Sequence, residues 1–331
     1  MTDLAVVAIG RNEGDRLVRC LASVPAGVSC VYVDSGSTDG SVAAARWAGA
    51  TVVELDLRTP FTAARARNEG LRAVPTTTRF VQFIDGDCEF ADGWLVTARQ
   101  RLLAEPGLTA VAGRLRERFP MVSVYNRLCD LEWDTPAGPC DAVGGIALVR
   151  RDALEGVGGF RESLIAGEEP ELCSRMRNRG GRVERLAAEM AVHDAAMTRF
   201  GQWWRRAVRA GYAYAEVSTL TRRTAAPIWA REVRGILAWG VILPVGVAVL
   251  SLLTGWAALA LGLYPLLMIK TYRTARSRWP ARQAALYAGF CVLAKFPQVV
   301  GVWRYWLGRV VRRPAGILEY KRPAAIPRAM P

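Results

Sequence analysis

Three carboxylates follow one apolar run of the chain at every second position. The run is "RFVQFIDGDCEF", residues 79–90, and its polar half contains Asp85, Asp87 and Glu89. Carboxylate oxygens spaced as Asp-x-Asp suit a hard divalent cation such as Mg²⁺ or Mn²⁺, which keeps coordination positions open for substrate phosphates. A solvated turn explains the same spacing. The segment therefore predicts either a metal site for a phosphorylated substrate or a polar turn after a buried strand.

Two other apolar runs also end in polar clusters. "LAVVAIGRNEGD" ends in Gly10 and Glu13, and "CVYVDSGSTDGS" ends in Asp34 and Asp39. Turn-forming and helix-capping residues account for the second cluster equally well. The first turn lacks the GxGxxG pattern of dinucleotide-binding folds, and the sequence has no GxxxxGK[ST] phosphate loop. Any nucleotide must therefore be held in another way.

The elements that position these clusters alternate between strand and helix. This alternation predicts an α/β fold with a mostly parallel sheet and flanking helices, in which ligands bind beyond the carboxyl ends of the strands. A basic aromatic helix, "FGQWWRRAVRAGYAYAEV", leads out of this region. The expected strands are 4–9, 30–34, 51–55, 80–85 and 108–113, with two more in "GRVERL" and "EMAVH", and the expected helices are 12–24, 38–49, 62–74, 93–105 and 168–181. The segment "DAVGGIALVRRDALEGVGGF" is expected to form a strand, a short helix and a glycine-rich loop.

The C-terminal third of the chain has a different character. Residues 1–200 carry 24 basic and 27 acidic side chains, whereas residues 201–331 carry 20 and 3. Residues 235–269 contain no charged side chain, and 35 residues of helix are about 50 Å long, enough for two short membrane crossings. We expect a helical hairpin turning near Thr254; a single tilted or broken span is the alternative.

Basic residues on both sides of this apolar segment predict its orientation. Four arginines precede it, and a lysine and three arginines follow it, so the positive-inside rule places both ends in the cytoplasm. The anionic partner of the basic third is then membrane lipid rather than nucleic acid. The N-terminus has no signal-peptide pattern, so we expect a cytosolic domain at 1–220 and a membrane-associated region at 221–331, with an interfacial helix at about 282–312.

Seven motifs in order give the chain a family resemblance. They are "RNEGDRLVRCLASV", "VDSGSTDGS", "ARARNEGL", "FIDGDCEF", "VGGF", "GEEPELCSRMRNRG" and the "QWWR" of "FGQWWRR", and they cover residues 4–215. The chain resembles family 2 glycosyltransferases with the GT-A fold. The resemblance implies that Asp87 binds the metal that bridges the donor's diphosphate. It assigns the nucleotide sugar to Gly10, Glu13, Asp34, Arg67 and Asp85.

The family's acidic pair matches Glu168 and Glu169, which places the catalytic base on Glu169. The family usually has Glu-Asp here, so the longer second side chain leaves Glu168 as an alternative base. Favourable placement of acidic residues at a helix N-terminus is the structural explanation. Three acidic residues in four positions, counting Glu171, exceed what capping requires.

Two further positions follow from the resemblance. His193 is the chain's one histidine, and some GT-A enzymes complete the metal site with a histidine downstream of the acidic pair; a core or surface histidine is the alternative. "QWWRR" is similar to the QxxRW motif of processive synthases, with Arg206 in place of Trp. Gln202 and Arg205 are therefore expected to serve the acceptor or the diphosphate, unless this helix only lies on the lipid surface.

Together these expectations describe a membrane-anchored, metal-dependent, inverting glycosyltransferase. It would use a nucleotide-diphosphate sugar, a UDP-sugar rather than a GDP-sugar, and add single sugars to a lipid-linked or polysaccharide acceptor of the cell envelope. The chain's 41 arginines against 3 lysines are typical of GC-rich bacterial genomes. Because the sequence also predicts membrane segments, we expect a multi-pass protein of the inner membrane. A sugar nucleotidyltransferase and a non-catalytic membrane scaffold with a degenerate transferase domain are the alternatives.

Overall fold

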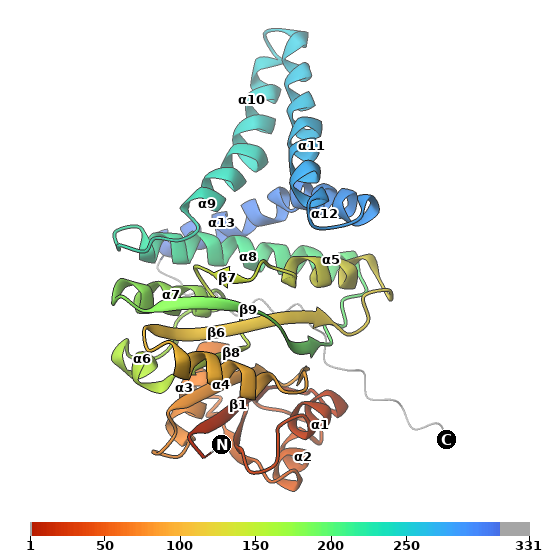
Figure 1. The fold of residues 1–331 in the computed structure, drawn as a ribbon. Helices are drawn as coiled ribbons and strands as arrows, with labels where there is room; N and C mark the ends of the chain where they lie inside the picture. The colour runs from red at the N-terminus through yellow and green to blue at the C-terminus, as the bar shows by residue number, and fades with distance from the viewer. Residues whose placement is uncertain (1, 312–331) are drawn as a thin grey trace.

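The computed structural model describes residues 2–311, and its elements form successive layers (Figure 1). A sheet with flanking helices makes up the N-terminal part. The long helix α8, Phe200–Thr221, lies between this sheet and the helices α12, Ala281–Leu293, and α13, Lys295–Val310. A helical hairpin extends away from the other layers. The described chain is therefore an α/β unit joined through α8 to a C-terminal helical region.

One half of the sheet is parallel, as the alternating pattern predicts. Its strands are β1, Leu4–Gly10, β2, Ser29–Asp34, β3, Thr51–Glu54, and β4, Phe80–Asp85, in the order β3-β2-β1-β4. Gly10 pairs with Asp34 on one side of β1, and Ile9 pairs with Asp85 on the other. The carboxyl ends of three strands therefore meet at one edge of the sheet, where the polar clusters lie.

The other half of the sheet is mixed, so the expectation of a mostly parallel sheet is wrong there. It contains β5, Cys88–Phe90, β6, Leu108–Glu117, β7, Gly138–Pro139, β8, Ala147–Arg150, and β9, Arg182–His193. β8 runs antiparallel to both β4 and β6, β6 and β9 are parallel, and β5 and β7 run antiparallel to β9. The two strands expected within 181–193 form the single strand β9. The intervening residues 186–189, "LAAE", remain in the strand, and the pairing of β9 with β6 shifts register around them.

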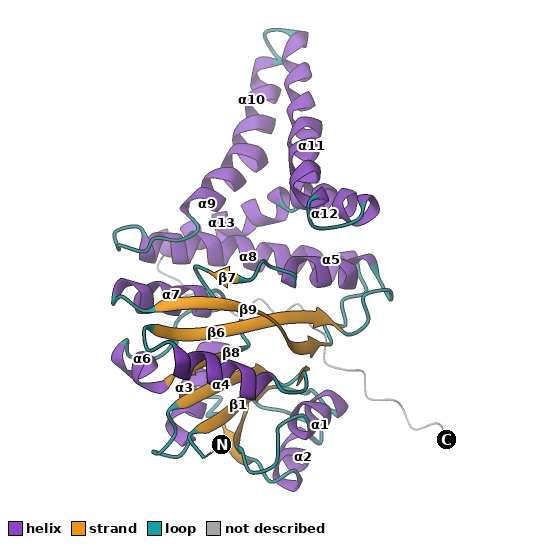
Figure 2. Ribbon diagram, in the orientation of Figure 1, coloured by secondary structure: helices purple, strands orange, loops and turns teal. Residues whose placement is uncertain are grey.

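Helices flank the sheet (Figure 2). The predicted helices are present; those on the sheet are a few residues shorter than predicted, although α7 begins where predicted, and α5 was not predicted. Packing is closest at α3, where a Cβ built on Gly70 would lie 2.2 Å from Cγ1 of Val7 on β1. This contact fixes the helix that carries Arg67. The helices are α1, Asp15–Ala22, α2, Ser41–Trp47, α3, Ala63–Ala73, α4, Trp94–Ala104, α5, Val124–Trp133, α6, Arg151–Gly156, and α7, Glu168–Asn178.

The C-terminal region forms the expected hairpin. One arm runs through α9, Ala230–Leu237, the π-helical turn η1, Ala238–Ile242, and α10, Leu243–Leu250. The chain turns back before Thr254, whose hydroxyl accepts a hydrogen bond from the N–H of Trp256. The other arm runs through the 3₁₀ segment η2, Gly255–Gly262, and α11, Leu263–Arg276. The turn therefore lies where the sequence predicts it.

Two helical stretches of the described chain are long and apolar enough to cross a membrane by length and composition. They are Ala230–Leu250, with 11% of its apolar window buried, and Ala281–Val310, with 22% buried. The first joins α9, η1 and α10, and the second joins α12 and α13. The second covers most of the segment predicted to be interfacial, whose last residue, 312, is outside the described residues. α13 meets α8 at two glycines: a Cβ on Gly301 would lie 2.0 Å from the carbonyl oxygen of Val208, and one on Gly211 would lie 2.1 Å from that of Gln298. The helix backbones therefore touch, which ties the two regions together.

Candidate functional site

The loops after β1 and β2 form one rim of the site. The N–H of Asn12 donates to the Ser37 hydroxyl, and the Asn12 side-chain oxygen accepts from the N–H of Thr38 at 2.7 Å. Asn12 has a φ of 56°, a left-handed conformation that asparagine tolerates better than most residues. Glu13 is almost buried and forms an ion pair with Arg16 at 2.7 Å. These contacts bring the predicted nucleotide residues Gly10, Glu13 and Asp34 to one place.

Asp34 is buried and accepts hydrogen bonds within its own loop. Its Oδ2 accepts from the N–H groups of Gly36 and Ser37 at 2.9 and 2.8 Å, and its Oδ1 accepts from the hydroxyls of Ser37 and Tyr32. Burial, and then the negative charge of Asp34, raises the pKa of Tyr32 above its usual value. Asp34 therefore builds the turn in this structure, while its contact with a nucleoside stays a prediction.

Asp87 and His193 meet across the sheet. Cys88 on β5 pairs with His193 at the end of β9, and this register places the Nε2 atom of His193 2.9 Å from Oδ2 of Asp87. Both side chains are buried, and the His193 ring lies 4.6 Å from the ring of Trp133 on α5. Burial lowers the pKa of His193, which favours the neutral imidazole that metals bind. The predicted metal ligands are thus together.

A carboxylate oxygen and a neutral imidazole nitrogen are suitable ligands for Mn²⁺ or Mg²⁺. The Cys88 sulfur completes a group of three potential ligand atoms, all within 4.8 Å of one another. Burial raises the pKa of the Cys88 thiol well above its usual value, so the thiol stays protonated, and hard cations prefer oxygen. Asp87 and His193 therefore fit the cation, with Cys88 as a neighbour.

Glu117, which the sequence did not single out, holds the loops around His193. It ends β6 beside His193 and is buried, and burial raises its pKa. Its two oxygens accept from the N–H groups of Phe119 and Ala195, each at 3.1 Å, and from the side-chain amide of Asn126 at 3.0 Å. Glu117 thus fixes the chain just beyond His193.

Arg67 on α3 joins the remaining predicted residues. Its Nη2 donates to Oδ1 of Asp85 at 3.0 Å, while Nη1 lies 2.9 Å from Oε1 of Glu168 and 2.8 Å from Oε1 of Glu169. Arg67 and Glu168 are buried, and the side chains of Glu169 and Asp85 are 14% and 40% exposed. Burial, and then the negative charge of Glu168, raise the pKa of Glu169 to about 7. The positive charge of Arg67 acts in the opposite direction and offsets part of this rise.

This geometry agrees with the comparisons with known proteins. Residues 6–158 match the model of the family described as "Glycosyl transferase family 2". This part of the chain is a family 2 glycosyltransferase domain. A "Pre-mycofactocin glycosyltransferase" of Mycobacterium tuberculosis is 33% identical over 205 residues, and "Glycosyltransferase AglE" of Haloferax volcanii is 23% identical over 225. The alignments cover 58% and 64% of this chain; the first covers 43% of its relative, less than half, and the second 72%.

Solved glycosyltransferase structures share the fold. The mannosyltransferase PcManGT from Pyrobaculum calidifontis, in complex with GDP-Man and Mn²⁺, has a TM-score of 0.57 at 23% identity and covers 94% of this chain and 86% of its own. S. aureus TarS 1-349, in complex with UDP-GlcNAc, has a TM-score of 0.50 at 13% identity, covering 94% and 92%. The predicted family and GT-A fold are confirmed.

Gln202 caps α8, the helix that follows β9. Its side-chain oxygen accepts from the N–H groups of Thr198 and Arg199 at 2.9 and 3.0 Å, and its amide donates to the carbonyl of Ala196 at 3.2 Å. Arg205 is exposed one turn later. These contacts give Gln202 a structural role, and the acceptor or diphosphate role of both residues stays a prediction.

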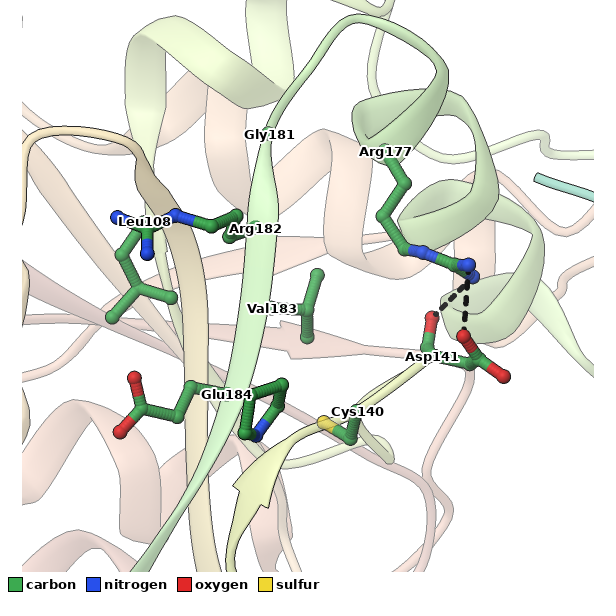
Figure 3. Close-up of a pocket in the computed structure, with 9 residues that line it drawn as sticks. Leu108, Cys140, Asp141, Arg177, Gly181, Arg182, Val183 and Glu184 are labelled. Atoms are coloured by element: carbon green, nitrogen blue, oxygen red, sulfur yellow. Dashed lines mark hydrogen bonds and ion pairs between the residues drawn. The ribbon is translucent and has the colours of Figure 1, made fainter. Parts of the chain in front are cut away.

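The hollow in Figure 3 lies away from these residues. It measures about 420 Å³ and lies where β6 and β9 begin, at Leu108 and Arg182, whereas the site lies where these strands end. Arg177 pairs with Asp141 there at 2.8 Å, as the figure shows, and Arg182 pairs with Glu105 on α4's C-terminal side. Because these charges already have partners, the hollow offers a charged ligand little.

Proposed function

We propose that the chain transfers a sugar from a nucleotide-diphosphate sugar to an acceptor at a membrane, with a divalent cation and with inversion at the anomeric carbon. One observation carries this proposal. The end of β4 lies between two acidic centres, the Asp87–His193 pair and the Glu169 carboxylate held at Arg67, with Asp85 joined to the second. A donor site and a base are what such a transfer requires.

The first centre suits the donor. Asp87 and His193 would hold Mg²⁺ or Mn²⁺, which neutralises the charge that develops on the departing diphosphate. Gly10, Glu13 and Asp34 would hold the nucleoside, together with Asp85 and Arg67. The solved relatives contain GDP-Man with Mn²⁺ in one case and UDP-GlcNAc in another, so both nucleotides belong in the donor panel. Preference for a UDP-sugar is our prediction.

The second centre suits the base. Glu169 would take the proton of the acceptor hydroxyl as that oxygen attacks the anomeric carbon opposite the diphosphate, which inverts the configuration. A base works best when its pKa is near the working pH, and burial brings the pKa of Glu169 to about 7. Glu168 is the alternative base, although it is the more buried of the two and accepts a hydrogen bond from Arg67.

The C-terminal region suits a membrane. Leu252, Leu253 and Trp256 at the hairpin tip are 85%, 83% and 78% exposed, which a bilayer would cover. The excess of basic residues after position 200 suits anionic lipids at the cytoplasmic face. We therefore propose a multi-pass bacterial inner-membrane protein that adds single sugars to a lipid-linked or polysaccharide acceptor. The acceptor named in the Mycobacterium relative, pre-mycofactocin, belongs in the same test.

The test is a thermal-shift panel of UDP- and GDP-sugars with Mg²⁺ or Mn²⁺, followed by product analysis. A ligand that binds only the native state raises the apparent stability. We expect a cation-dependent shift with one donor and release of the nucleoside diphosphate during transfer. Release of pyrophosphate would instead identify a sugar nucleotidyltransferase. Binding of no donor in the panel would favour the non-catalytic scaffold and refute the proposal.

A further inference from the structure

Arg67 lies where three separate elements meet. The helix α3 supplies its side chain, the end of β4 supplies Asp85, and the start of α7 supplies Glu168 and Glu169. Only 2% of Arg67 is exposed, and three carboxylate oxygens lie within 3.0 Å of its two Nη atoms. One guanidinium therefore serves carboxylates on both the donor side and the base side of the proposed site.

The guanidinium is a rigid planar fork, so its two ends are fixed relative to each other. Nη2 is occupied by Asp85, and Nη1 is shared by Glu168 and Glu169. A shift of Asp85 would thus move the atom that holds Glu169. A lysine would supply the charge without this two-sided geometry.

Packing prevents the fork from turning away. A Cβ on Gly145 would lie 2.7 Å from Nη2 of Arg67 and 3.3 Å from Oε1 of Glu169, so the chain before β8 passes directly against the cluster. The ring of Phe160 lies 5.7 Å from Cζ on another side. Asn68 holds Phe160 in place, because its side chain donates to the Phe160 carbonyl at 2.9 Å and accepts from the Phe160 N–H at 2.8 Å.

We infer that Arg67 is a positioning residue: it fixes the carboxylate of Glu169 in one orientation and ties it to Asp85 on the donor strand. The catalytic part of this inference rests on the proposed function. Among the described residues whose charges act most strongly on Glu169, Arg67 is a cation, while Glu168 and Asp85 are carboxylates; the Cys173 thiol also lies near Glu169. Without Arg67, Glu169 would be buried beside like charges, and both conditions favour the protonated acid.

The closing experiment follows the infrared band of a protonated carboxyl group across pH in the full chain, assigned as the band that Glu169→Gln removes. We expect Arg67→Gln to raise the pH midpoint of this band by about one unit or more, a tenfold change in the ratio of acid to carboxylate. Arg67→Lys should keep the midpoint near that of the wild type but lower kcat. Arg72→Gln, on an exposed arginine of α3 that pairs with Glu69, is the control and should change neither.

A matched pair of glycine variants guards against misfolding of Arg67→Gln. Gly145→Ala should displace the guanidinium while leaving its charge in the fold, and should raise the midpoint and lower kcat with little change in donor KM. Gly144→Ala should do neither, because a Cβ there meets nothing within 4 Å. The inference is refuted if the midpoint is unchanged in Arg67→Gln, or in Gly145→Ala where the arginine variant does not fold. A wild type that turns over no nucleotide sugar refutes the proposed function alone, since the infrared midpoints still decide the role of Arg67.

Discussion

Replacing Glu169 by glutamine should stabilise the protein at neutral and alkaline pH. The glutamine side chain would have nearly the shape of the protonated glutamate but could not ionise. Burial and the neighbouring Glu168 raise the pKa of Glu169 from 4.5 to about 7, although Arg67 acts in the opposite direction. The folded protein therefore favours the neutral side chain, and ionisation of Glu169 is a cost of folding that the variant would remove.

The size of this cost depends on pH. A native pKa above the unfolded value means that the native state holds the proton more tightly, so the stability linked to Glu169 is complete below about pH 4.5 and is lost as the pH rises through about 7. A difference of about 2.5 units at 1.36 kcal/mol each gives about 3 kcal/mol at pH 8 and, by the same linkage, about 1 kcal/mol at pH 5. The gain from Glu169→Gln should therefore grow with pH.

The assay is urea unfolding of the full chain in detergent at pH 5 and pH 8, monitored by circular dichroism. Glu155→Gln is the control, because Glu155 is 56% exposed and pairs with Arg151 at the surface, where an ion pair contributes about 0–1 kcal/mol. The same Glu169 variant should retain donor binding but lose transfer. A gain in stability that is equal at the two pH values, or a loss at pH 8, would refute the reasoning.

Three further substitutions test other parts of the site. Asp87→Asn should lower Mn²⁺-dependent transfer about a hundredfold or more with the fold unchanged, since even outer-shell partners of a metal site contribute about 10–100-fold; steady-state rates near wild type would contradict the metal role. Asn68→Ala leaves the buried N–H and C=O of Phe160 without their partner, so urea unfolding should show a loss of about 2–5 kcal/mol, and a loss under about 1 would mean that water replaces the amide. Gln202→Ala removes the cap of α8 and should cost about 1 kcal/mol by the same measurement; an unchanged midpoint would show that the cap is dispensable.

The sequence predicts those features that depend on local pattern. The strands β1 to β4 are continuous apolar runs bounded by turn residues, and the structure contains all four. Because parallel strands end at one edge, the nearness of Gly10, Asp34 and Asp85 follows from the fold class alone. The hairpin turn near Thr254 follows equally from an apolar length that exceeds one crossing.

Features that depend on distant pairing could not be predicted in this way. β8 lies between β4 and β6 and runs antiparallel to both, which no local signal indicates. The short strand β5 follows the "DGD" turn and runs in the opposite direction to β4. In the sequence its three residues look like a continuation of that turn. The side chains of helix α5 face several different partners, so no single apolar face marks it in the sequence. Tyr125 of α5, for example, contacts Phe290 on α12.

The predicted residues also acquired roles that their motifs did not specify. Arg67 was expected to help bind the nucleotide, yet its contacts reach Glu168, 101 residues away, because the Asn68–Phe160 pairing brings that segment onto α3. The glycines at 144 and 145 look equivalent in the sequence, but only at Gly145 would a Cβ collide with the cluster. Which of two adjacent glycines is essential depends on tertiary packing.

The three carboxylates after β4 have three different partners from three parts of the fold. Asp85 meets Arg67 from α3, Asp87 meets His193 from β9, and Glu89 meets Arg118, which follows β6. Glu89 is 35% exposed, and its ion pair with Arg118 links it to the end of β6. Opposite charge close to a carboxylate favours its ionised form, so a strand end can hold this much negative charge only because the sheet order brings these groups together. The partner of Asp87 is an imidazole whose pKa is lowered by burial, so this carboxylate and the neutral ring together suit a bound cation.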